Sequence, residues 1–330
     1  MLWKIKHIFN FDEKKSWKNG YAQFGFHDHH GNNYVLRNED HWLGQITRKD
    51  NFLWTAGSSD PKLSDVHIKC DIKSPMYLSR ANHEEVLFVS SGGNKQIFKI
   101  YPKEETAEVF IDAKNFGLTD IGNCVCDKDD ALWINEITGC RIWQFNSQGE
   151  KIVVLGNGQP GFQKEKTKFE RVQFNWIYDI RLGSSNDLYV LDSRNFAVRK
   201  VDVVNGLVET IAGTGRSGYT GDGDIASQAT FGAKVGEQFD GPWSLSLDEE
   251  ENIFIGDTQN HVIRMIEKKT EIISTIAGNK DCIPHKRNSP LETSPLKLNL
   301  PRICSLDYYQ KELFIPEWDG DLIVLEKQDS

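Results

Sequence analysis

The strongest constraint on the fold is a segment that the chain nearly repeats. GLVETIAGTG at 206–215 is followed later by TEIISTIAGN at 270–279. Each copy is preceded by a similar pair of short apolar runs, DLYVLDSRNFAVRKV at 187–201 and NIFIGDTQNHVIRMI at 252–266. Self-similarity at a period of tens of residues is typical of a chain built as an array of one small unit. The sequence therefore predicts a repeat protein.

The repeated unit has the pattern of four short β-strands. In the best copy, PWSLSLD at 242–248 is followed by an aromatic strand, a TQN turn at 258–260, and two further apolar runs. Apolar and polar residues alternate within these runs, and turn residues separate them, as expected for strands. Aromatic residues make up 11% of the chain, and these side chains favour strands. No segment demands a helix.

An aromatic residue in the second strand of the unit marks each copy along the chain. The markers lie within DLYVLD, NIFIGD and ELFIPE in the later copies, and within weaker copies earlier in the chain. Six copies of four strands each would fill the 330 residues. In chain order, the markers are Tyr34, Phe88, Trp133, Tyr189, Phe254 and Phe314.

Six four-stranded units arranged radially make a six-bladed β-propeller. The sixth unit ends after its third strand, DLIVLEKQ at 321–328, whereas the chain opens with an unassigned strand at 2–11. We expect the N-terminal strand to complete the last blade and so to close the ring. The prediction is an all-β chain in which residues 1–330 form one propeller.

The fourth and fifth units resemble the NHL-repeat family. VETIAGTGRSGYTGDGDIASQATF at 208–231 and the runs at 242–248 and 252–266 carry the resemblance. The other units match only in pattern. The resemblance implies a six-bladed β-propeller. The family includes protein- and RNA-binding domains and a peptide-amidating lyase, so the fold does not by itself settle the function.

The net charge and the cysteine content limit the classes of function that the chain can have. The net charge is −9, which disfavours binding to nucleic acid or to anionic membranes. The N-terminal apolar run contains lysines, unlike a signal peptide, and no window has the length of apolar residues that a membrane helix needs. The six cysteines are scattered and are interpreted as reduced thiols. We therefore expect a cytoplasmic monomer without a membrane segment.

Two motifs in the chain could be mistaken for ligand sites. In HDHH at 27–30, Asp28 aligns with Asp248 of the fifth unit, so the two following histidines are interpreted as turn residues rather than as metal ligands. In the 213–224 segment, three glycines and the acids Asp222 and Asp224 are interpreted as a tightly folded connection. A nucleotide site would need a helix after the glycines, and a Ca²⁺ site would need more oxygen ligands.

The position just after the second strand carries an acid in four units. Asp192 and Asp257 each have an arginine seven residues later, which predicts the ion pairs Asp192–Arg199 and Asp257–Arg264. Glu136 and Glu317 lack an arginine at that spacing. An acid without a structural partner is a better functional candidate, and the alternative is that both glutamates are simply solvated.

Loops between blades and turns between second and third strands are expected to share one face beside the central channel. Acids, an arginine and aromatic residues on this face predict a pocket for a small molecule or a peptide. The residues placed there are Asp120, Asn175, Trp176, Tyr178, Asp179, Asp240, Trp243, Arg302, Trp318 and Asp319.

Two functions follow from this face. The first is a binding module for a peptide, protein or small molecule, in which the ligand contacts are Trp176, Trp243, Trp318, Asp319, Asp120 and Asn175. The second, implied only by resemblance to metal-dependent propellers, is a metal-assisted hydrolase or lyase. Its metal, Ca²⁺, Mg²⁺, Mn²⁺ or Zn²⁺, would be held by Glu136, Asp179, Asp240 and Glu317. His261, Tyr178 and Arg302 are its further catalytic candidates. Binding to RNA is disfavoured because the face is acidic.

Overall fold

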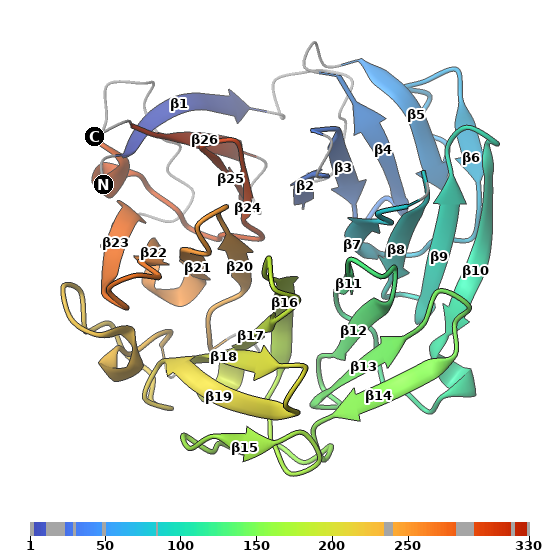
Figure 1. Ribbon diagram of the computed structural model, residues 1–330. Helices are drawn as coiled ribbons and strands as arrows, with labels where there is room; N and C mark the ends of the chain where they lie inside the picture. The colour runs from blue at the N-terminus through green and yellow to red at the C-terminus, as the bar shows by residue number, and fades with distance from the viewer. Residues whose placement is uncertain are drawn as a thin grey trace.

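Six β-sheets surround a central axis as the blades of a six-bladed propeller (Figure 1). This computed structural model describes residues 3–10, 24–28, 31–47, 51–83, 85–233, 240–281, 294–317 and 321–328. The innermost strand of each sheet faces the axis, and the chain passes from blade to blade in sequence order (Figure 1). The predicted all-β fold is confirmed.

The first three blades are antiparallel sheets whose four main strands follow chain order. Their strands are β2 (Phe24–His27), β3 (Asn33–Arg37), β4 (Trp42–Ile46) and β5 (Phe52–Gly57); β7 (Pro75–Arg80), β8 (Leu87–Ser91), β9 (Gln96–Tyr101) and β10 (Thr106–Asp112); and β11 (Cys124–Cys126), β12 (Leu132–Glu136), β13 (Arg141–Phe145) and β14 (Lys151–Leu155).

The last three blades repeat this order, except that the outer strand of the sixth comes from the start of the chain. Their strands are β16 (Ile177–Leu182), β17 (Leu188–Asp192), β18 (Ala197–Asp202) and β19 (Leu207–Ala212); β20 (Ser244–Leu247), β21 (Ile253–Asp257), β22 (Val262–Ile266) and β23 (Ile273–Gly278); and β24 (Asp307–Tyr309), β25 (Glu312–Pro316), β26 (Asp321–Lys327) and β1 (Trp3–Asn10).

Strand β1 closes the ring as predicted. It pairs antiparallel with β26, from Trp3 opposite Lys327 to Asn10 opposite Asp321. Both ends of the chain therefore belong to the same blade (Figure 1). The Trp3 ring also packs edge-on against Phe254 of the fifth blade, with 5.5 Å between ring centroids. The closing strand is thus held by its own sheet and by the neighbouring one.

The first and fourth blades each have a fifth strand that the sequence did not predict. β6 (His67–Lys69) pairs parallel with β5, and β15 (Thr167–Lys168) pairs antiparallel with β19. Both strands lie in long connections between blades. Each covers the outer edge of a sheet, where unpaired backbone groups would otherwise face solvent.

The aromatic markers lie on the second strand of their sheets, and Tyr34 and Trp133 reach the turn that precedes that strand. The Tyr34 hydroxyl donates to Asp28 Oδ2 at 3.0 Å, and Trp133 Nε1 donates to Asp127 Oδ2 at 3.1 Å. Asp28 Oδ1 also accepts from Asn32 N, as Asp248 Oδ1 does from Asn252 N. Asp28 and Asp248 therefore occupy equivalent turns, as the alignment predicted. His29 and His30 lie outside the described residues.

The glycine of the repeated TIAG segment has a specific steric role. Gly213 and Gly278 have positive φ angles of 94° and 88°. A Cβ at either position would lie 2.2 Å from a backbone carbonyl oxygen, that of Phe196 or of His261. Both of those residues are themselves left-handed, at the turn between the second and third strands. The end of the fourth strand thus passes directly over this turn, and only glycine fits there.

Apolar side chains fill the wedges between neighbouring sheets. One cluster extends from the first to the fourth blade and includes Val89 and Val190, and a second joins Leu191 of the fourth blade to Ile255 of the fifth. The cysteines at 70, 124, 126, 140 and 304 are unbridged, and Cys124 belongs to the cluster between the second and third blades. In the described part of the chain, helical segments are short turns, and none has the length and apolar character to cross a membrane.

Candidate functional site

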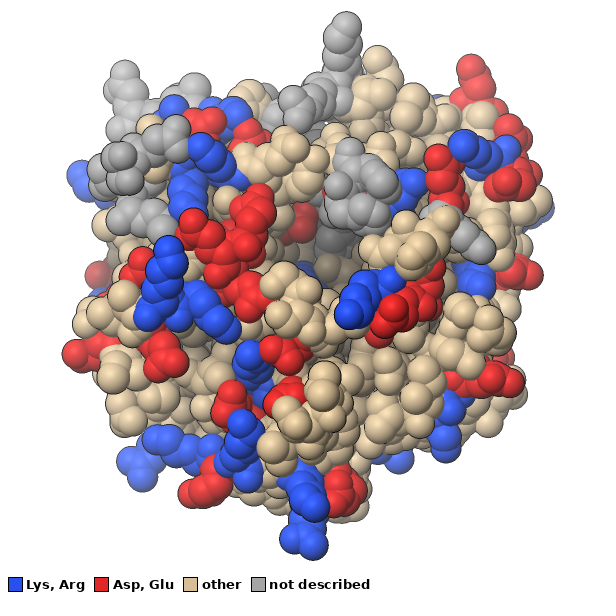
Figure 2. All heavy atoms as spheres, viewed as in Figure 1, with Lys and Arg blue, Asp and Glu red and all other residues tan. Residues whose placement is uncertain are grey.

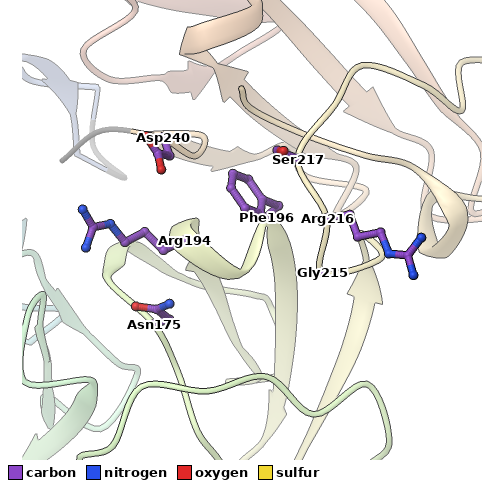
Figure 3. A pocket seen from close by; sticks show the side chains of 7 residues that line it. All are labelled: Asn175, Arg194, Phe196, Gly215, Arg216, Ser217 and Asp240. Carbon is purple, nitrogen blue, oxygen red and sulfur yellow. The ribbon is translucent and has the colours of Figure 1, made fainter. Parts of the chain in front are cut away.

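A depression of about 570 Å³ lies where the connections of the fourth and fifth blades meet. Asn175 precedes β16, and Arg194 and Phe196 belong to the turn between β17 and β18. The other lining residues come from the connection between β19 and β20. In Figure 3, Asp240, Arg194 and Asn175 lie along one side of the Phe196 ring. The lining residues are Asn175, Arg194, Phe196, Gly215, Arg216, Ser217 and Asp240.

Arg194 packs against the ring of Trp176. The guanidinium carbon lies 4.2 Å from the centroid of the Trp176 ring, which is a cation–π contact. Arg194 N donates to Asn175 O at 3.0 Å, and Ser193 N donates to Trp176 O at 3.1 Å. Trp176 has a left-handed φ of 63°, which costs a side-chain-bearing residue about 1 to 2 kcal/mol. The turn and the segment before β16 therefore form one unit.

Asp192 fixes the position of Asn175. Its Oδ1 accepts from Asn175 N at 2.7 Å, and its Oδ2 accepts from Asn195 Nδ2 at 2.8 Å. Arg199 Nε lies 3.6 Å from the same carboxylate, so the predicted Asp192–Arg199 pair is confirmed. Asp192 is fully buried, and this burial raises its pKa to about 6.

In three other blades, the equivalent residue also accepts a hydrogen bond from a backbone N–H of a connection between blades. Ser91 Oγ accepts from Lys73 N at 2.9 Å, Glu136 Oε1 from Thr119 N at 2.6 Å, and Asp257 Oδ1 from Gly232 N at 2.8 Å. This position, which the structure places at the last residue of the second strand, therefore has a scaffold role. Its acceptor satisfies a backbone N–H that a buried connection would otherwise leave unpaired.

The expectation that Glu136 lacks an arginine partner is wrong. Arg141 Nε donates to Glu136 Oε2 at 2.7 Å, and Trp143 Nε1 donates to the same oxygen at 2.7 Å. The arginine stands five positions after the acid rather than seven, directly opposite it in the β12–β13 pair. Glutamate is one methylene longer than aspartate and can reach it. Glu317 is 3% exposed, and its backbone bridges to Ile303.

The predicted Asp257–Arg264 pair is replaced by another arrangement. Arg264 Nε and an Nη donate to Asp222 Oδ1 at 3.1 and 2.7 Å, and the guanidinium also donates to the backbone carbonyls of Thr220 and Thr230. Asp257 instead accepts from Gly232 N and from Asn260 Nδ2. The fully buried Arg264 thus organises the connection that contains Asp222, which has a structural role.

Asp179 lies inside the ring rather than on the loop face where the sequence placed it. It is 2% exposed, and it forms an ion pair with Arg181 on the same strand. Its carboxylate accepts from Asn123 Nδ2 at 2.6 Å and from Leu245 N at 2.8 Å. Burial raises its pKa to about 6 although Arg181 acts in the opposite direction.

Most of the other predicted site residues have packing or capping roles. The Tyr178 and Trp243 rings are stacked, 5.6 Å apart, and Trp243 is 7% exposed. Asp120 accepts from Ile137 N and Thr138 N and so caps the β12–β13 turn. His261 Nδ1 lies 3.2 Å from Leu300 O. Arg302 is exposed. Trp318 and Asp319 lie outside the described residues.

The four carboxylates proposed as metal ligands are not brought together. Glu136 and Asp179 are each paired with an arginine, whereas Asp240 lines the depression. Across the described ranges, no three His, Cys, Asp or Glu side chains are grouped as ligands of one ion. This donor set does not fit a Ca²⁺, Mg²⁺, Mn²⁺ or Zn²⁺ site, and we derive no catalytic step through a metal.

The sequence prediction included Asn175, Trp176 and Asp240 at this face but missed Arg194 and Phe196. They belong to SRNF at 193–196, which aligns with TQNH at 258–261 of the fifth blade. The available signal was the presence of arginine and phenylalanine in this turn, where the fifth blade has glutamine and histidine. On the face shown in Figure 2, the described basic side chains are interspersed with acidic ones and form no continuous basic surface.

Comparison with known proteins supports the fold and leaves the family open. No family model matches the chain. Protein SUPPRESSOR OF QUENCHING 1, chloroplastic, from Arabidopsis thaliana is 28% identical over 140 residues, which are 40% of this chain and 12% of that protein. This chain therefore matches only a small part of that curated relative.

Two solved structures resemble the whole ring. An auxiliary nutrient binding protein from Bacteroides ovatus ATCC 8483 matches over 99% of this chain and 77% of its own, with a TM-score of 0.65 and 11% identity. Virginiamycin B lyase from Staphylococcus aureus matches over 99% of this chain and 100% of its own, with a TM-score of 0.57 and 11% identity. Likeness at this identity shows the six-bladed propeller fold alone.

Proposed function

We propose that this chain is a propeller-type binding module, of NHL-repeat type, that holds a peptide or a small molecule in the depression between the fourth and fifth blades. One observation carries the proposal. Polar side chains from three separate segments, Asn175, Arg194 and Asp240, meet around one depression of about 570 Å³. This volume lies within the usual range of small-molecule pockets, roughly 300 to 1,000 Å³.

The walls of the depression are built on a fixed backbone. Asp192 holds Asn175, and Asn195 Nδ2 donates to Gly161 O at 2.6 Å. Gly241 approaches the turn so closely that a Cβ there would lie 1.9 Å from Ser193 O. A preformed site lowers the entropic cost of binding, because few groups have to be ordered when the ligand arrives.

The alternative function, a metal-assisted hydrolase or lyase, has no specific observation in its favour among the described residues. Its proposed ligands are separate, and two of the four are engaged in ion pairs with arginine. The similar solved propellers include a nutrient-binding protein and a lyase, so their fold is compatible with either function.

The test is a ligand-observed NMR screen of a library of metabolites and short peptides. The screen compares the wild type with Ser217→Trp, which fills the depression, and with Ser147→Trp, which adds the same side chain at an exposed turn. We expect hits that bind the wild type and the control but are lost in Ser217→Trp, with both variants keeping the wild-type melting temperature. The proposal fails if every hit binds all three proteins equally, or if the library gives none.

A further inference from the structure

Building on the function proposed above, we propose that the ligand of this depression is a small zwitterion, a free α-amino acid or a dipeptide. In this arrangement, Arg194 and Asn175 bind the carboxylate of the ligand, Asp240 binds its ammonium group, and Phe196 packs against its apolar part.

The lining carries both signs of charge on one side of the depression. Arg194 and Asp240 both lie on the same side of the Phe196 ring, whereas Arg216 points away on the other side (Figure 3). A ligand that is only anionic would meet the Asp240 carboxylate, and a ligand that is only cationic would meet the Arg194 guanidinium. Like charges brought together at a binding site disfavour binding. A ligand with one charge of each sign avoids both conflicts.

The support of Arg194 suits it to a carboxylate. Its guanidinium carbon lies 4.2 Å from the centroid of the Trp176 ring, and this cation–π contact holds the group in place. A planar guanidinium binds a carboxylate through two parallel hydrogen bonds, a geometry that an ammonium group lacks. Asn175 stands beside it on the same rim, with its backbone fixed by Asp192 at 2.7 Å. Its amide can supply a further donor.

Phe196 provides an apolar surface between these polar groups and the connection that carries Ser217 (Figure 3). The ring is backed by Gly232, where an added Cβ would lie 3.0 Å from Phe196 Cδ1. The residue itself is half-buried, in a left-handed conformation with a φ of 48°. A ring supported in this way offers a rigid face to a short apolar side chain or to a Cα–Cβ unit of the ligand.

The first test is differential scanning fluorimetry of the full-length protein with each of the twenty amino acids and a set of dipeptides. A parallel panel contains sugars and dicarboxylates. We expect at least one zwitterion to raise the melting temperature. Comparison of the free amino acids with the dipeptides then shows which of the two kinds of zwitterion the depression binds. If only sugars or dicarboxylates do so, the depression binds ligands but the inference is wrong. If the NMR hits still bind Ser217→Trp, and no compound of either panel raises the melting temperature of the wild type, both proposals fail.

The second test removes one charge of the ligand at a time. Calorimetry measures the affinities of the best zwitterion, of its amide, which lacks the carboxylate charge, and of its N-acetyl form, which lacks the ammonium charge. The wild type should bind each modified form at least about tenfold more weakly than the unmodified zwitterion. Arg194→Gln should abolish the preference over the amide, and Asp240→Asn the preference over the N-acetyl form. The exposed controls Arg171→Gln and Asp129→Asn should keep both preferences. Equal affinity of all three ligands for the wild type, or unchanged preferences in the two lining variants, would overturn the inference.

Discussion

The buried ion pair between Asp179 and Arg181 connects five of the six blades. Both residues lie on β16 of the fourth blade. Asp179 accepts from Asn123 before β11 and from Leu245 of β20. Arg181 donates to Leu306 O before β24 at 3.4 Å and lies over the Tyr77 ring of β7 at 4.6 Å. Because these contacts come from blades two to six, the pair acts as a hub at the centre of the ring.

Removing one partner of this hub is expected to destabilise the protein strongly. Asp179→Ala leaves the guanidinium of Arg181 buried without its counter-charge, which should lower the free energy of unfolding by about 3 to 5 kcal/mol. Urea denaturation measures the change. Glu85→Gln is the matched control, because the Lys103–Glu85 pair is exposed and should contribute less than about 1 kcal/mol. Equal effects of the two variants would show that the hub is not energetically important.

Stability should depend on pH through Asp257, whose pKa burial raises to about 6. The folded state then binds the proton more tightly than the unfolded chain, whose aspartate titrates near 3.8. The contribution of this group is therefore fully present below about pH 4 and is lost as the pH rises towards 6. The free energy of unfolding of the wild type minus that of Asp257→Asn, measured by urea denaturation at several pH values, should decrease as the pH rises through this window.

Glu251 provides a control of opposite sign for this measurement. Hydrogen bonds from Ser184 and Tyr189 lower its pKa to about 2 in spite of desolvation. Its contribution should be present above about pH 4.5 and should be lost as the pH falls towards 2. The difference between wild type and Glu251→Gln should thus increase with pH. The same slope for both variants would contradict the assignment.

The glycine of the TIAG repeat should tolerate no side chain. Gly278→Ala places a Cβ 2.2 Å from His261 O at a left-handed φ, so strain and a backbone clash act together. We expect the melting temperature to fall by several degrees more than in Gly206→Ala. Gly206 also has a positive φ, of 67°, but an added Cβ there has no heavy atom within 4 Å. If both alanine variants melt together, the close approach has no energetic consequence.

The closing strand should contribute through Trp3. Trp3→Ala removes a ring that is 9% exposed and packed on Phe254, so unfolding should become easier by about 3 to 5 kcal/mol. Thermal and urea unfolding measure the loss. Val204→Ala, at a side chain that is 89% exposed, should change stability by less than about 0.5 kcal/mol. A small effect of Trp3→Ala would mean that the ring is held closed by backbone pairing alone.

The ring and its closure could be predicted because the repeat shows where strands begin and end. The glycine at 213 and 278 and the turn acids Asp28 and Asp248 each meet a backbone requirement that recurs in more than one blade. These requirements depend on local conformation, which the sequence expresses directly. The fifth strands, β6 and β15, lie in connections whose sequences do not repeat, so no periodic pattern predicted them.

Side-chain partners could not be predicted in the same way. A register shift between Ile177 and Asp179 places an extra residue in β16, so simple alternation gives the wrong direction for Asp179. Glu136 finds Arg141 because its longer side chain reaches an arginine at a different spacing. The depression depends on how the connections around Asn175 and Ser217 fold against each other, which no repeat specifies.

The pairing of β1 with the sixth blade also constrains how the protein is made. Lys6 contacts Glu312, a residue 306 positions further along the chain. During synthesis, β1 leaves the ribosome before β26, so it has no partner until the long stretch of chain between the two strands has been made. Its exposed edge is open to wrong pairing throughout that interval, because long-range strand pairing is slow and unpaired edges invite association. Lys4 and Lys6 lie on that strand, and charges of this kind keep an unpaired edge soluble until the ring can close.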